Sequence, residues 1–155
     1  MTAPLLAVPV AGARRTIPTE LFGPLDIAEE HIIEFSEGIL GFPACHGWVL
    51  IDGAKPGTAW LQSVEYSALV FLLADPFVFF EGFTAELSPT ELRRLDAREP
   101  GQLAVFAIVT LPERRSGDAT ANLQGPIIIN VHSRRGAQVV LGESSWSVRQ
   151  PISFG

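Results

Sequence analysis

The segment at positions 48–76, WVLIDGAKPGTAWLQSVEYSALVFLLADP, decides the fold class. It holds three short runs rich in aliphatic and aromatic residues, at 48–51, 60–64 and 69–74. Glycine, proline and aspartate separate these runs and also end the third one, at Asp75-Pro76. Apolar runs of this length between turn residues are typical of β-strands. The segment therefore predicts three consecutive strands.

The same pattern continues on both sides of this segment. Further runs lie at 32–35, 103–111, 127–131 and 138–141, again separated by turn residues. Short strands at a spacing of roughly ten residues favour a barrel or a sandwich. The chain has 155 residues, which is the length of one domain. We predict a mostly β, compact, β-barrel-like single domain.

One short helix is predicted at about residues 89–98. Ser88 is in the position of an N-cap, Pro89 in the first helical position and Glu91 in the capping-box position. Pro100 and Gly101 then end the helical pattern.

Composition narrows the classes of partner. The net charge is −6, from 17 acidic and 11 basic residues. Nucleic acid and anionic membranes attract concentrated positive charge, so we expect neither as a direct partner, whereas a basic protein fits. The single cysteine excludes a disulfide within the chain, and a reducing cytoplasm is the expected location.

The N-terminus is predicted to be a tail. Positions 1–13 are mostly apolar, but no positive charge precedes them, and Arg14 and Arg15 follow them. A secretory signal has the opposite order. We therefore expect a flexible tail at 1–15 and a folded domain at 16–155.

Five of the ten phenylalanines lie between positions 71 and 83. A strand cannot place the adjacent Phe79 and Phe80 on one face. Two interpretations stay open, a core covered on both faces and an exposed aromatic patch for binding a protein.

Patterns for catalysis are missing from the sequence. It has no G-x-S-x-G, P-loop or H-E-x-x-H motif. Cys45 and His46 are adjacent, but two residues do not complete a zinc site or a nucleophile with its base. The carboxylates are scattered, with no pair that the spacing fixes. We expect no metal, no cofactor and no enzymatic activity.

Whole phrases of the sequence resemble one family. They run in order from about Thr16 to Ile152 and include FGPLDI at 22–27, IIEF at 32–35, EGILGF at 37–42, WLQSV at 60–64, DPF at 75–77, TANL at 120–123 and GPIIIN at 125–130. The chain resembles FliW, the bacterial flagellar assembly factor.

Some positions depart from the family pattern. Ser36 and Leu40 replace two family prolines, which makes that turn less rigid. Arg134 and Arg135 stand where the family commonly has lysines, and Gln150 replaces a histidine.

The resemblance implies a compact β-barrel-like domain without catalysis. It implies two partners, flagellin and CsrA, a small basic RNA-binding protein that represses flagellin translation. Competition between these two partners would couple the flagellin level to translation by mass action. The acidic charge suits a basic partner and would steer its encounter.

The candidate partner-binding positions are motif residues that we expect to be exposed. The polar ones have an alternative role, which is to satisfy backbone groups at strand ends. The candidates are Asp75, Phe77, Phe80, Asn122, Gln124 and Asn130. Core positions are predicted at Phe42, Trp60, Leu61 and 127–129.

Two other function classes remain open. One is a small-molecule-binding β-barrel or an unrecognised hydrolase, which needs an enclosed pocket with converging polar groups. The other is a nucleic-acid-binding barrel, which the net charge disfavours. We expect a monomer or a weak dimer, because exposed edge strands can pair.

Overall fold

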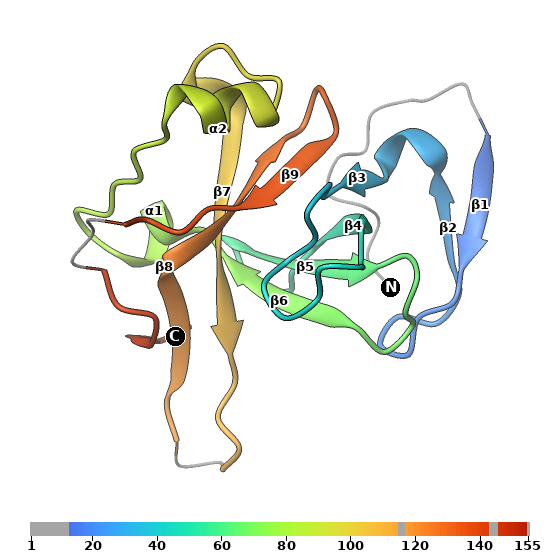
Figure 1. Ribbon diagram of the computed structural model, residues 1–155. Helices are drawn as coiled ribbons and strands as arrows, with labels where there is room; N and C mark the ends of the chain where they lie inside the picture. The colour runs from blue at the N-terminus through green and yellow to red at the C-terminus, as the bar shows by residue number, and fades with distance from the viewer. Residues whose placement is uncertain (1–12, 115–116, 143–145, 155) are drawn as a thin grey trace.

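The computed structural model describes residues 13–114, 117–142 and 146–154 (Figure 1). Its strands are β1 Arg14–Ile17, β2 Leu25–Ala28, β3 Ile33–Glu34, β4 Gly47–Asp52, β5 Thr58–Ser63, β6 Val70–Ala74, β7 Leu103–Thr110, β8 Ala119–Asn130, β9 Arg135–Gln138 and β10 Gln150–Ile152. Its helices are α1 Pro76–Phe79 and α2 Pro89–Arg94, with single 3₁₀ turns at Glu29–His31 and Pro100–Gln102.

Seven strands close into a barrel. Their order is β8-β7-β6-β5-β4-β3-β9, and β9 pairs back onto β8. All neighbours are antiparallel except β3 and β9. β10 adds to β8 outside the ring, and β1 and β2 form a separate hairpin. The predicted mostly β, barrel-like fold is confirmed.

Alternation along the strands fills the barrel. On β4, Trp48 and Leu50 point to the inner cluster, whereas Val49 and Ile51 join an outer cluster. Leu61 of β5 and Ile127 and Ile129 of β8 complete the inner packing with almost no exposed surface. Side chains thus occupy the barrel interior, which argues against a barrel that encloses a small molecule.

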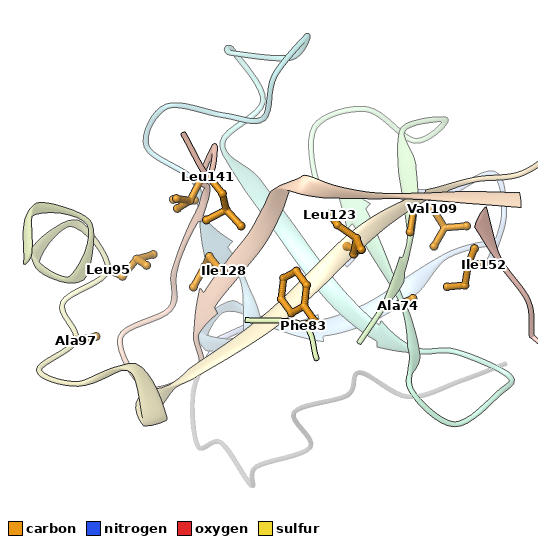
Figure 2. Close-up of a cluster of buried hydrophobic side chains, with 13 residues drawn as sticks. Ala74, Phe83, Leu95, Ala97, Val109, Leu123, Ile128, Leu141 and Ile152 are labelled. Atoms are coloured by element: carbon orange, nitrogen blue, oxygen red, sulfur yellow. The ribbon is translucent and has the colours of Figure 1, made fainter. Parts of the chain in front are cut away.

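Two outer layers cover the barrel. The β1–β2 hairpin packs on β4 and β5, with the Phe22 ring against the half-buried Trp60 at 6.1 Å between centroids. The segment 75–102 covers the outer face of β7 and β8, and Figure 2 shows the buried cluster that forms there. This outer cluster includes Phe83 and Leu95 of the segment together with side chains of β7 and β8, so the segment packs tightly on the outside of the barrel.

The helix ends earlier than predicted. The capping box at Ser88 and Glu91 is present, but α2 stops at Arg94 rather than near position 98. Asp96 takes a positive φ of 53°, and the Ala97 N–H donates to the Leu92 carbonyl, 2.8 Å away. This left-handed residue with its closing hydrogen bond ends a helix as a glycine would. No helix among the described residues is long and apolar enough to cross a membrane.

The phenylalanine run is not a continuous strand. The Asp75 carboxylate accepts from the Phe77 N–H at 2.9 Å and starts one helical turn. Phe79 and Phe80 are half-buried against the outer cluster, Phe83 is buried and Phe77 is exposed. Most of the run is therefore part of the core, and Phe77 is the one phenylalanine of the five that is exposed.

Most of the predicted runs correspond to strands of the structure. The structure adds β1, β2 and β10 near the two ends of the described chain, and β8 begins earlier than predicted, at Ala119. Most of the predicted tail, residues 1–12, lies outside the described residues, but Arg14 and Arg15 belong to β1 and pair with β2. β9 covers 135–138 instead of 138–141, because its register is set by β8.

Candidate functional site

Exposed apolar side chains gather at one end of the barrel, where β6 begins and β7 ends. Among the described residues, nine large apolar side chains are exposed. Five of these nine line two neighbouring hollows: Leu40, Phe42, Tyr66, Leu111 and Val148. We call the residues that line the two hollows the barrel mouth.

The first hollow is almost wholly apolar and has a volume of about 450 Å³. The loop 41–45 forms one wall, and Tyr66 and Leu69 form the other. The Phe42 ring packs edge-on against Phe71, 5.7 Å between centroids, at the border with the second hollow. The two hollows thus adjoin at this aromatic pair.

The prediction that Phe42 is a core residue is wrong. Its side chain is 38% exposed, whereas Ile39 is buried. Ile39 and Phe42 pair across a tight turn, in which Gly41 adopts a φ of 90°. Because the turn reverses the chain, Ile39 points inward and Leu40 and Phe42 remain at the surface.

The second hollow is larger, about 600 Å³. The β7–β8 hairpin extends past the barrel (Figure 1), and the paired residues Ile108 and Asn122, where that extension begins, line the hollow. Leu40 and Phe71 stand opposite them. Glu113, Asp118 and Arg149 also line it, so this hollow combines apolar side chains with two carboxylates and one guanidinium.

A hydrogen-bond relay holds Leu40 over this hollow. The Gln138 side-chain oxygen accepts from the Leu40 N–H at 2.9 Å, and its amide donates to the Gly125 carbonyl at 2.9 Å. The Asn122 side-chain oxygen accepts from the N–H groups of Gln124 at 3.0 Å and Gly125 at 2.9 Å. One relay thus connects the 39–42 turn to the bend of β8.

The bend of β8 explains why polar residues interrupt its apolar pattern. Phe106 of β7 pairs with Ile127, but Ile108 pairs with Asn122, so β8 inserts extra residues at this point. Such a bulge leaves backbone N–H groups without ladder partners. The Asn122 side chain supplies the missing acceptor.

The two predicted residues at this bend have different surroundings. Asn122 is half-buried and lines the second hollow. Gln124 is half-buried too, and its amide donates to the Leu141 carbonyl. Asn122 therefore combines the backbone role with a place in the barrel mouth.

Asn130 is not exposed, and that expectation is wrong. Only 3% of its surface is accessible. Its amide donates to the carbonyls of Leu95 at 3.0 Å and Asp96 at 3.1 Å. Its oxygen accepts from the N–H groups of His132 and Ser133. The Asn130 side chain thus links the end of α2 to the β8–β9 turn through hydrogen bonds, and it is buried between them.

The remaining candidates lie away from the barrel mouth. β6 begins at the mouth and ends at the opposite side, where Asp75 follows it. Phe77 is 56% exposed and contacts Phe83 edge-on at 5.3 Å, and with the exposed Val78 it forms a small second patch. Phe80 packs on the outer cluster and is half-buried. The structure therefore separates Asp75, Phe77 and Phe80 from Asn122.

The described residues offer little for catalysis. They contain no group of three or more His, Cys, Asp or Glu side chains that could hold a metal ion. Cys45 is buried, and desolvation together with the Glu65 carboxylate raises the pKa of its thiol. The His46 ring nitrogen Nε2 lies 3.0 Å from the Pro43 carbonyl. A thiol kept neutral in this way is a poor nucleophile.

Sequence reasoning missed Leu40, Tyr66, Leu111 and Val148, which are four of the five exposed apolar side chains at the mouth. The substitution of leucine for a family proline at position 40 was the available signal. From sequence alone this substitution indicates only a less rigid turn, because the exposure of the side chain depends on how the loop closes.

Comparisons with known proteins agree with one another. The profile of the family described as FliW protein matches residues 16–152. The chain is 38% identical over 132 residues to a flagellar assembly factor FliW of Natranaerobius thermophilus, with 84% of this chain and 87% of that protein covered. It is 37% identical over 136 residues to the FliW of Treponema denticola, with 88% and 92% covered. A crystal structure of the flagellar assembly factor FliW aligns with a TM-score of 0.81 at 34% identity and covers 88% of this chain and 96% of that one.

Proposed function

The chain belongs to the FliW family, and from this premise we propose that it is a non-enzymatic regulator that binds CsrA and flagellin in the bacterial cytoplasm. By occupying CsrA it relieves the repression of flagellin translation. By occupying this protein, flagellin leaves CsrA free to repress. The chain itself contacts neither RNA nor a membrane.

The observation that carries this proposal is the barrel mouth. Contiguous exposed apolar surface is rare on monomeric proteins and marks interaction sites. Here it combines exposed aromatic anchors, Phe42 and Tyr66, with charged side chains of which two are carboxylates, Glu113 and Asp118, and one is a cation, Arg149. Aromatic residues contribute most to interface energies, and carboxylates steer a basic partner. We therefore place the CsrA contact at the barrel mouth, with Asn122 among its lining residues.

The second patch is the rival location. Phe77 and Val78 are both exposed, but they stand on a single helical turn and line neither hollow of the mouth. A flat pair of side chains offers less buried surface than two adjoining hollows. We keep this patch as the comparison in each experiment.

A gel shift tests the proposal. CsrA of the same bacterium is bound to a labelled flagellin leader RNA, and the purified protein is added in increasing amounts. We expect free RNA to appear as a complex of the two proteins forms. Flagellin added afterwards should return CsrA to the RNA.

The controls separate binding from nonspecific effects. The protein alone must leave the RNA unshifted at every salt concentration, because its net charge is −6. An RNA that stays bound to CsrA while the added protein is folded would overturn the proposal.

A further inference from the structure

The seam between β6 and β7 opens at the barrel mouth. Their ladder consists of the pairs Leu72–Val109, Leu73–Ile108 and Ala74–Ala107. β6 extends beyond it to Val70 and β7 to Thr110, but no pairs join them there. The ring of the barrel is closed by these three pairs, and the two strands separate beyond them at this corner.

An unpaired strand edge results on β7. Thr110 still pairs with Thr120 of β8 on its other side, so the strand remains extended. Successive residues of a strand direct their N–H and C=O groups to opposite sides. By this alternation Val109 faces β6, Thr110 faces Thr120 of β8, and Leu111 directs its backbone groups to the open seam.

This edge borders the second hollow. Thr110 and Leu111 line it together with Phe71 and Leu40, and Leu111 is 55% exposed. Natural proteins usually protect an open edge with lysine or with inward charges. Thr110 and Leu111 are uncharged, and the first carboxylate, Glu113, stands beyond the edge.

We propose that a basic protein partner adds an extended segment to the free edge of β7, with alternate apolar side chains entering the second hollow. Strand addition gains affinity from backbone hydrogen bonds and specificity from pockets that take every second side chain. A hollow of about 600 Å³ beside an open edge provides both.

The charges near the second hollow indicate which kind of segment binds there. The charged side chains that line this hollow are Glu113, Asp118 and Arg149, so carboxylates outnumber the cation by one, and the whole chain has a net charge of −6. A segment with a lysine or arginine beside its apolar residues complements these carboxylates, whereas an acidic segment is repelled. The inference rests on the proposed function and specifies how its basic partner, CsrA, is held.

Amide hydrogen exchange followed by NMR tests the inference on the intact protein with CsrA as the probe. We expect the Leu111 amide to exchange tenfold or more slowly in the complex. Leu111→Asp should weaken binding at least tenfold, and Val140→Asp, equally exposed but outside both hollows, should bind as the unchanged protein does.

The outcomes distinguish this inference from the proposed function. If CsrA binds and protects only the 40–44 and 66–69 amides, strand addition is wrong and the proposed function stands. If flagellin but not CsrA protects the Leu111 amide, the assigned occupant is wrong. If folded protein binds no CsrA, both are wrong.

Discussion

Two asparagines of β8 have the same side chain and different surroundings. Asn130 is sealed beneath the end of α2, and Asn122 lines the barrel mouth. Both accept hydrogen bonds from two backbone N–H groups that follow them in the chain. The local role could be predicted from sequence, since asparagine often bonds backbone two residues onward. The exposure could not, because it depends on α2, more than thirty residues away.

We expect Asn130→Ala to lower the free energy of unfolding by about 2 kcal/mol, because it leaves buried backbone groups without partners. Ser133→Ala is the matched control. The Leu95 carbonyl accepts hydrogen bonds from both side chains, so in Ser133→Ala it still accepts the hydrogen bond from the Asn130 amide. Urea denaturation of both variants measures the difference, and equal losses would contradict this account.

Two glycines of the 38–41 turn provide a second comparison. Both have positive φ, but a Cβ on Gly38 would lie 2.4 Å from the Phe42 carbonyl oxygen, whereas a Cβ on Gly41 meets nothing within 4 Å. We expect Gly41→Ala to lower the free energy of unfolding by about 1 kcal/mol, because alanine disfavours the positive φ of this position. Gly38→Ala should cost about 2 kcal/mol more, because backbone must shift. Thermal unfolding of the two variants checks the order, which a similar loss in both would refute.

At the scale of elements, the sequence predicted those strands and helix ends that the local pattern of residues determines. The runs at 48–51, 60–64 and 103–111 became β4, β5 and β7, because apolar residues between turn residues leave few alternatives. The capping box placed the start of α2 correctly. β1, β2, β10 and the polar first part of β8 were not predicted, because neighbouring strands rather than their own composition hold them in place.

The candidate site could be predicted only in part, for the same reason. The family motifs pointed to Asn122, which lines the mouth. Leu40, Tyr66 and Leu111 come from three loops or strand ends that meet only when the barrel closes. No spacing in the sequence brings them together.

Gln138 links the elements that form the mouth. We expect Gln138→Ala to release the Leu40 turn, since the side chain bonds both Leu40 and Gly125. CsrA affinity should fall roughly three- to tenfold, as binding then has to order the turn. Titration calorimetry gives the affinity, and circular dichroism verifies that the barrel remains. Unchanged affinity in a folded variant would show that the turn needs no such anchor.

At the scale of the whole molecule, the barrel is a rigid support for an asymmetric surface. Its interior is filled, and its outer faces are covered by the β1–β2 hairpin and by the 75–102 segment. The exposed apolar area that remains gathers mainly at the mouth, on a chain with a net charge of −6. A buried core beside an exposed apolar end on an acidic chain is the arrangement expected of a binding protein for a basic partner.

The most direct test is a calorimetric titration of CsrA into Leu40→Asp and Val78→Asp, two variants that alter side chains 68% and 62% exposed and so should stay folded. The account predicts that Leu40→Asp loses at least tenfold in affinity, because a charge enters the apolar mouth, while Val78→Asp binds like the unchanged protein. Full affinity in Leu40→Asp together with a loss in Val78→Asp would contradict it and move the site to the α1 patch.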